Sequence, residues 1–229
     1  MPRRDFPVSA ATLAAAAATG LSALPLLAQA QARAFQSGSD YLTLDKPAAT
    51  EAPAGQVEVV EFFWYNCPHC NGFEPMFDAW TKKLPKDVSA RRVPIAFRPD
   101  FEPQQRLYYT LDSLGKLDEL HKKVFQAIHV DKQLLNTADQ ITAWAEKQGL
   151  PKAKFVEMFN SFSVSTKVRK ATQLQEAYAL DGVPALGING RYFTSGSQAK
   201  TLERALQVAD YLIGQSRQGI TTAAKPAKS

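Results

Sequence analysis

The sequence contains a nearly uninterrupted apolar run at residues 57–65, broken only by Glu58 and Glu61. A strand with one face in water would alternate apolar and polar residues, whereas a strand covered on both faces is apolar throughout. We therefore predict a central buried strand here. Residues 90–97 predict a second strand, and residues 41–44 predict an edge strand.

A helical period begins soon after this run. Four apolar residues follow at spacings of four, three and four: Phe73, Phe77, Trp80 and Leu84. Such a stripe predicts a helix with one apolar face. Pro68 falls in the first turn, where its missing N–H is harmless, and Pro75 lies inside the helix, where it is expected to cause a kink.

Helical patterns dominate the next part of the chain, residues 98–163. Apolar residues at helical spacing predict four helices there. A capping box at Thr137 and Gln140 marks the start of the third of them. A longer helix is predicted over residues 163–180.

The C-terminal part returns to strands and then to a helix. Residues 183–193 predict a hairpin that turns at Asn189 and Gly190, a dipeptide typical of two-residue hairpin turns. Residues 202–213 predict an amphipathic helix, and residues 217–229 predict a flexible C-terminal tail. The order of strand, helix, strand, helices, hairpin and helix indicates an α/β fold with an all-helical insertion.

Residues 1–32 have the features of an export signal. Arg3 and Arg4 precede an alanine- and leucine-rich stretch that ends in small residues. An uncleaved membrane anchor is the alternative, but the stretch is only weakly apolar and contains polar residues and a proline. The arginine pair is also similar to a twin-arginine signal, so the export route stays open, although either route leads out of the cytoplasm.

Composition is that of an ordinary globular protein. The chain has 229 residues, of which 45% are hydrophobic, and this is sufficient for one large domain or two small ones. Its formal net charge of +5 is mild, and no cluster of basic residues indicates a nucleic-acid partner.

The only two cysteines lie in the segment Cys67-Pro68-His69-Cys70, between the predicted central strand and the following helix. The N-terminus of a helix presents unpaired N–H groups and the positive end of the helix dipole, and both lower the pKa of a thiol placed there. Cys67 is therefore the candidate nucleophile of a redox-active dithiol. Export to an oxidising compartment is consistent with that chemistry.

Two other interpretations of the cysteine pair are less favoured. A structural zinc site needs four ligands, and the remaining histidines, His121 and His129, lie far along the chain without ligand spacing, so no metal is expected. A purely structural disulfide would close so short a loop that it would restrict the unfolded chain little.

Four segments of the sequence together resemble the DsbA family of periplasmic thiol:disulfide interchange proteins, within the thioredoxin superfamily. They are Glu61-Phe62-Phe63, Cys67-Pro68-His69-Cys70, Phe73-Glu74 and Gly182-Val183-Pro184-Ala185. The resemblance implies an α/β thioredoxin fold with an inserted all-helical domain. Residues 33–97 and 164–216 would form the thioredoxin-like domain and residues 98–163 the insertion, with Val183-Pro184 as a cis-proline turn that faces the dithiol.

The resemblance also implies roles at the dithiol. Cys67 would be the attacking, partly exposed sulfur and Cys70 the buried resolving sulfur, with Pro68 and Pro184 as further active-site residues. His69 would stabilise the Cys67 thiolate, and the alternative is a loop histidine without a role.

Two acidic residues match family positions that either adjust pKa values at the dithiol or relay protons. Glu61 would lie beneath the dithiol and relay a proton to or from Cys70, whereas at the edge of a strand it would simply reach water. Glu74 would assist it, unless it is only an exposed charge on a helix face. Arg92 aligns with a position where the family typically has lysine, and arginine cannot exchange a proton.

The implied function is that of a protein thiol:disulfide oxidoreductase that needs no cofactor beyond its dithiol. In the periplasm it would oxidise reduced, newly exported polypeptides, with Val183 pairing with the client backbone. The membrane-bound quinone-linked oxidase DsbB would reoxidise it, and a monomer is expected. The alternatives are a disulfide isomerase or reductase of the same superfamily and, less favoured, a thioredoxin-like metal-binding carrier.

Overall fold

The computed structural model describes residues 35–223. The predicted signal peptide, residues 1–32, and the end of the predicted tail, residues 224–229, lie outside the described residues. From Phe35 onward the described chain forms one compact unit. Within it, no helix has both the length and the apolar character needed to cross a membrane.

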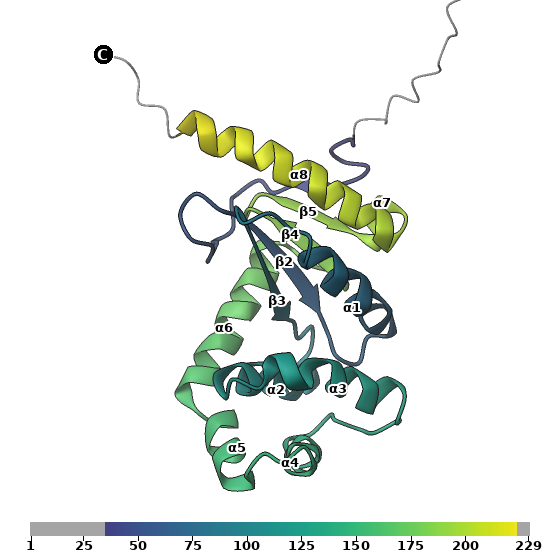
Figure 1. Cartoon of the computed structure of the whole chain (residues 1–229), viewed down its shortest axis with the longest axis vertical. Helices are drawn as coiled ribbons and strands as arrows, with labels where there is room; N and C mark the ends of the chain where they lie inside the picture. The colour runs from purple at the N-terminus through teal and green to yellow at the C-terminus, as the bar shows by residue number, and fades with distance from the viewer. Residues whose placement is uncertain (1–34, 224–229) are drawn as a thin grey trace, which may run out of the picture. The chain divides into compact units, whose positions relative to one another are not determined.

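A five-stranded mixed sheet forms the centre of this unit (Figure 1). Its strands are β1 (Leu42–Thr43), β2 (Val57–Phe63), β3 (Val88–Pro94), β4 (Ala185–Ile188) and β5 (Tyr192–Ser195). The order is β1-β5-β4-β2-β3, with β2 parallel to β3 and antiparallel to β4. The predicted central strand, β2, is buried at every position, and β1 lies at an edge. The second strand lies earlier than predicted, because β3 pairs residue by residue with β2, which ends at Phe63.

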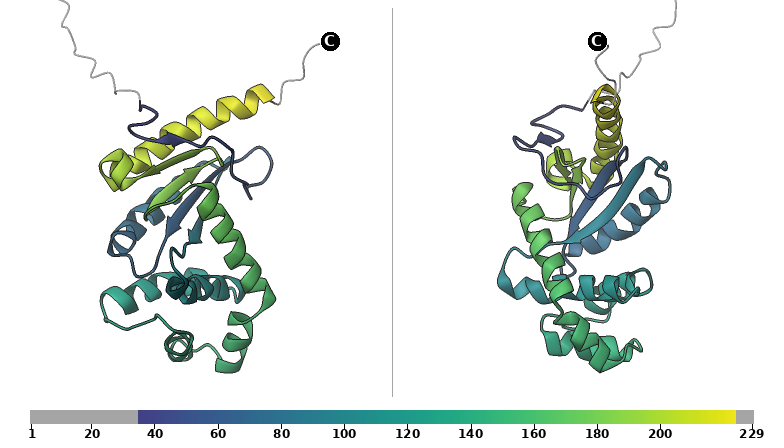
Figure 2. Two further views of the ribbon diagram at one scale, coloured as in Figure 1. Left: turned by 180° about the vertical axis from the view of Figure 1, so that it is seen from behind. Right: turned by 90° about the vertical axis from the view of Figure 1, so that its left-hand side faces the viewer.

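Helices cover both faces of the sheet. They are α1 (Pro68–Thr81), the short 3-10 helix η1 (Pro99–Phe101), α2 (Glu102–Ser113), α3 (Leu117–His129), α4 (Ala138–Lys147), α5 (Lys152–Phe159), α6 (Phe162–Ala177), α7 (Gly196–Ala199) and α8 (Leu202–Ala223). Figure 2 shows α1 and α6 on opposite faces of the sheet, and Figure 1 shows α2 to α5 grouped beyond one end of it. This is a thioredoxin fold with an all-helical insertion. The predicted ends of the insertion fall just before η1 and in the first turn of α6, and its separation as a domain stays a prediction.

The uniformly apolar character of β2 arises because its two faces pack into different cores. Val59 packs with residues of α1 and α8, whereas Val60 packs with residues of α6. The same alternation places Glu61 on the α1 side and Glu58 on the α6 side. Glu58 accepts a hydrogen bond from Arg91 Nε at 3.0 Å, so this buried carboxylate is paired.

The predicted hairpin forms between β4 and β5. Asn189 and Gly190 have φ angles of 51° and 63°, in the left-handed region that a type I′ turn requires. The Arg191 N–H donates to the Ile188 carbonyl at 3.0 Å and closes the turn. A side chain at Gly190 would meet the backbone oxygen of Ala48, so the close approach of another segment also favours glycine.

The helix starts agree with the sequence better than the helix ends. The predicted capping box at Thr137 and Gln140 is present at the start of α4. Helix α6 ends at Ala177, three residues before the predicted end at residue 180. Helix α8 continues to Ala223, so the predicted tail is wrong over residues 217–223. Ser216, in the first turn beyond the predicted helix end at residue 213, is buried.

Candidate active site

The two cysteines lie where β2 leads into α1. Cys67 immediately precedes the helix with extended backbone angles (φ −76°, ψ 117°), and Pro68 occupies the first turn. Both thiols are free. Cys70 is completely buried, whereas Cys67 is 8% exposed. A client can therefore reach the sulfur of Cys67, the first cysteine of the motif, whereas Cys70, the second, lies behind it.

The surroundings of the two sulfurs shift their pKa values in opposite directions. The pKa of Cys67 is lowered to about 6, mainly by a hydrogen bond from the Cys70 thiol. Burial opposes this shift, but the backbone N–H groups of Cys70 and His69 and the charge of His69 favour the anion. Burial, together with the neighbouring Cys67, raises the pKa of Cys70 far above its usual range. The arrangement therefore favours a Cys67 thiolate beside a protonated Cys70.

The Cys67 environment predicts an unusual pH dependence of alkylation. In the reduced protein, we expect the rate of carboxamidomethylation at Cys67 to have a midpoint near pH 6, with about a tenfold loss per pH unit below it. Mass spectrometry of the modified peptide measures this rate. His69→Ala should raise the midpoint, because one source of positive potential is removed. A wild-type midpoint near 9.0, the ordinary thiol value, would contradict the assignment.

The loop before β4 faces the dithiol. Its Val183-Pro184 peptide bond is cis, as the resemblance implies. The Cys67 sulfur lies 3.5 Å from the Val183 carbonyl oxygen, which accepts a hydrogen bond from the thiol when Cys67 is protonated. His69, Val183 and Pro184 also line a cavity of about 560 Å³, together with residues of the segment between β5 and α8. A client segment could therefore contact the reactive sulfur and this cavity at once.

A cluster of charged residues is buried beneath the dithiol. Glu61 is 1% exposed in the central strand, so its placement at a strand edge is wrong. Its direct neighbour on β3 is Arg92, whose Nε lies 3.1 Å from Glu61 Oε2. Arg92 also donates to both oxygens of Glu74, from Nη2 at 2.9 Å and from Nε at 3.0 Å. Glu74 is 4% exposed, so the exposed-charge alternative is wrong as well.

Glu61 has the protonation behaviour expected of a buried acid. Burial raises its pKa to about 8, with Glu74 adding to the shift and Arg92 opposing it. Glu61 is therefore mainly protonated at neutral pH and lies close enough to Cys70 to affect the pKa of that thiol. An acid with a pKa near neutrality can both take up and release a proton under physiological conditions.

Two residues that the sequence pattern did not indicate, His121 and Tyr65, extend this cluster. His121 Nε2 lies 3.2 Å from Glu74 Oε2, and His121 Nδ1 lies 2.8 Å from the Tyr65 hydroxyl. The one signal in the sequence was the place of His121 within the apolar stripe of α3, one turn from Leu117 and one turn from Phe125, which indicates a buried side chain. Metal-ligand spacing, the criterion applied to this histidine, does not detect such a role.

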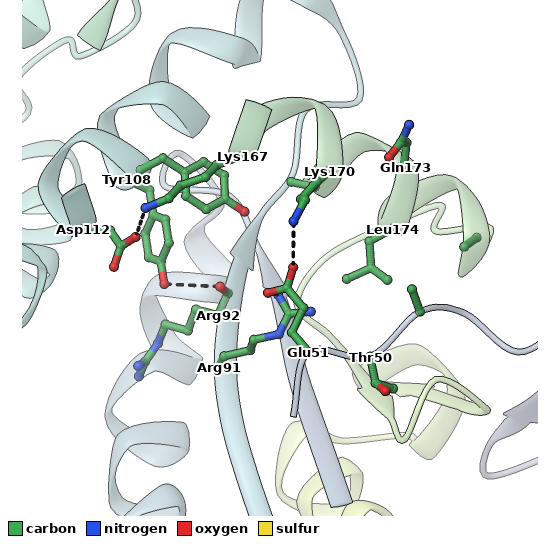
Figure 3. Close-up of a pocket in the computed structure, with 14 residues that line it drawn as sticks. Thr50, Glu51, Arg91, Arg92, Tyr108, Asp112, Lys167, Lys170, Gln173 and Leu174 are labelled. Carbon is green, nitrogen blue, oxygen red and sulfur yellow. Dashed lines mark hydrogen bonds and ion pairs between the residues drawn. The ribbon is translucent and has the colours of Figure 1, made fainter. Parts of the chain in front are cut away.

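A second pocket, of about 640 Å³, lies between β3, α2 and α6 (Figure 3). Most of its charged side chains are paired with one another: Arg91 contacts Glu51 at 3.6 Å, and Lys167 contacts Asp112 at 2.6 Å. Neither cysteine lines it. Among the described residues, no group of three or more histidine, cysteine or acidic side chains is arranged to hold a metal ion.

Comparisons with known proteins agree with the geometry of the dithiol. Residues 58–207 match a family described as the DSBA-like thioredoxin domain. The chain is 45% identical over 202 residues to the thiol:disulfide interchange protein DsbA of Bordetella parapertussis, covering 88% of this chain and 95% of that protein. It is 41% identical over 189 residues to the DsbA of Burkholderia cepacia, covering 82% and 89%. The crystal structure of Pseudomonas aeruginosa DsbA is similar with a TM-score of 0.77 and 36% identity, covering 82% of this chain and 97% of that one.

Proposed function

This chain belongs to the DsbA family of thiol:disulfide interchange proteins, and on that premise we propose that it donates a Cys67–Cys70 disulfide to newly exported proteins. It is a protein thiol:disulfide oxidoreductase, and an isomerase or reductase is not favoured. The observation that carries the proposal is a reachable Cys67 with a pKa lowered to about 6, in front of a buried Cys70.

The reaction proceeds through a mixed disulfide. A client thiolate attacks Cys67 of the oxidised protein, the Cys67–Cys70 bond breaks, and the Cys70 sulfur leaves and takes up a proton. A second client thiolate then attacks the client sulfur of the mixed disulfide and displaces Cys67 as a thiolate. The client loses two electrons and gains a disulfide, while the dithiol gains the two electrons.

The low pKa of Cys67 determines the direction of this exchange. The thiolate is stabilised only in the reduced protein, so reduction is favoured and the disulfide is a strong oxidant. Cys67 is also the sulfur displaced in the second step, and a thiol of low pKa is a good leaving group. Pro68 at the start of α1 and His69 beside the sulfur support this environment.

Proton transfer at the buried sulfur is assigned to Glu61. Cys70 leaves as an anion in a site where burial strongly disfavours its charge. Glu61 supplies the proton, and Glu74 and Arg92 set its environment. Arg92 cannot take part in the transfer because a guanidinium stays protonated.

Client binding is assigned to the loop that faces the dithiol. The Val183 backbone pairs with an extended client segment, which places a client cysteine next to Cys67. Pro184 shapes this loop, and the adjoining cavity of about 560 Å³ accepts neighbouring client side chains. Backbone pairing does not depend on sequence, so many clients can be oxidised.

The proposed setting is the periplasm, which the predicted export signal and the family both support. The reduced protein would be reoxidised there by DsbB, the membrane-bound quinone-linked oxidase. A monomer is proposed as the working form, since a single dithiol and its facing loop suffice for the reaction.

An equilibrium titration against glutathione tests the proposed direction of exchange. We expect a reduction potential more oxidising than that of protein disulfide isomerase, about −180 mV. The measurement follows the oxidised fraction by thiol trapping in buffers of defined glutathione ratio. A clearly more reducing potential would favour a reductase or isomerase, and the lack of a reversible redox step would favour a metal carrier.

A further inference from the structure

The buried cluster beneath the dithiol contains two carboxylates and one guanidinium. It is electrically neutral when one of Glu61 and Glu74 is ionised and the other is protonated, with Arg92 as the cation. Burial strongly disfavours a net charge, so this neutral state dominates around neutral pH. The position of the single proton then determines whether Glu61 is an acid or a base.

The hydrogen bonds of the two carboxylates are unequal. Glu74 accepts two N–H bonds from Arg92, at 3.0 and 2.9 Å, and its Oε2 lies 3.2 Å from His121 Nε2. Glu61 Oε2 is 3.1 Å from Arg92 Nε, yet among the described residues it has no hydrogen-bond partner. N–H donors stabilise the ionised form of a carboxyl group, so the negative charge is favoured on Glu74.

The tautomer of His121 is determined by its second contact. The Tyr65 hydroxyl lies 2.8 Å from His121 Nδ1 and can donate to it, which leaves the proton of a neutral ring on Nε2, facing Glu74. Burial lowers the pKa of His121, so the ring is neutral over the working range. The ring therefore donates one hydrogen bond, and it donates that bond to Glu74.

We propose that His121 is a positioning residue of the exchange reaction, which keeps the negative charge of the cluster on Glu74 and the proton on Glu61. Through this contact a helix of the insertion, α3, controls the acid beneath the reactive pair. The effect on exchange rests on the proposed role of Glu61 as proton donor, whereas the distribution of charge does not depend on it.

The other ionisable groups near the cluster do not replace this contact. Tyr108 of α2 donates its hydroxyl hydrogen to the Arg92 carbonyl at 3.2 Å, and burial raises the pKa of that tyrosine well above its usual range, so it stays neutral. Lys122, beside His121 on α3, pairs with Asp78 at 2.6 Å. Cys70 is a protonated thiol.

Carbon-13 NMR of the Glu61 carboxyl group in the reduced full chain measures the charge distribution directly. In the wild type at pH 6.5, we expect less than about a tenth of Glu61 to be ionised, given its pKa of about 8. His121→Leu removes one of the three donors to Glu74, so the preference for charge on Glu74 weakens and the ionised fraction of Glu61 should rise several-fold, although the two Arg92 bonds remain. His121→Gln, which can still donate to Glu74, should restore most of the wild-type fraction.

Two further variants separate this role from a general effect on α3. His129→Leu removes a hydrogen bond of 2.8 Å to the Tyr65 carbonyl from the same helix, and Glu61 should remain protonated. Tyr65→Phe removes the hydroxyl that selects the tautomer, and the ionised fraction of Glu61 should rise. This second test remains available if His121→Leu does not fold.

Unchanged protonation of Glu61 in both His121→Leu and Tyr65→Phe would overturn the proposal. Should His121→Leu fail to fold, an unchanged Tyr65→Phe spectrum would have the same meaning. The pH profile of mixed-disulfide resolution is then measured for the same variants. A changed Glu61 charge with an unchanged profile would leave the effect of His121 on the charge distribution standing, and it would remove both Glu61 and His121 from the exchange reaction.

Discussion

Cys67→Ser is expected to lower the rate of disulfide transfer to a reduced client by on the order of 10³-fold or more, because the only reachable sulfur is lost. Serine keeps the size of the side chain, so the fold should be retained. The measurement follows the recovery of activity by a reduced, unfolded client whose native state needs a disulfide. A variant that still restores disulfides would contradict the assignment of Cys67 as the attacked sulfur.

Cys70→Ser provides the matched comparison. It also lacks a disulfide to donate, but it keeps Cys67 with the N–H groups of the α1 first turn. When mixed with a client that already contains a disulfide, this variant should form a mixed disulfide and free one client thiol; once that thiol is alkylated the mixed disulfide should accumulate, since Cys70 is no longer present to release it. Electrophoresis without reductant should detect the covalent complex for Cys70→Ser and none for Cys67→Ser.

Arg92→Leu is expected to lower the free energy of unfolding by about 3–5 kcal/mol at pH 8, because two buried carboxylates lose their common cation. The loss should be smaller at pH 5. Lowering the pH protonates the carboxyl groups in the folded variant, and the penalty for a buried unpaired charge then disappears. Denaturation by urea at the two pH values measures the difference.

Arg98→Leu is the control variant, because it also replaces an arginine by leucine but removes only an exposed ion pair. Arg98 pairs with Asp100 at 2.7 Å, but its side chain is 64% exposed. Exposed pairs contribute little, so this variant should change the free energy of unfolding by less than about 1 kcal/mol. Equal losses for the two variants would show that the Arg92 cluster contributes no more than a surface ion pair.

The fold was largely predictable because its signals are local. The run at residues 57–65 identified the central strand, Asn189 and Gly190 identified the turn, and the Thr137 capping box identified a helix start. The end of α8 was missed, because its last turns, up to Ala223, carry few apolar residues and so lack the periodic pattern that marks a helix in the sequence.

The place of the two cysteines and their order of burial were predictable, although the hydrogen bond from Cys70 that mainly lowers the pKa of Cys67 was not. The cluster beneath them was predictable only in part. Glu61 carried a local signal, an acid in an apolar run, but whether it reached water depended on distant segments. Glu74 lies 47 positions from His121, and Tyr65 lies 56 positions from it. No spacing rule connects residues so far apart, so the role of His121 became visible only when α1, α3 and the segment after β2 were placed together.

The burial of Cys70 beside Cys67 limits the lifetime of each mixed disulfide with a client. Once a client is joined to Cys67, the buried neighbour is held beside the bond and can attack it at any moment, releasing the client unchanged. Its raised pKa makes the attacking anion scarce and so delays this reversal. A client whose second cysteine attacks the mixed disulfide before Cys70 does is released oxidised, and a slower client is released reduced. The burial of Cys70 therefore favours clients whose two cysteines are already close together.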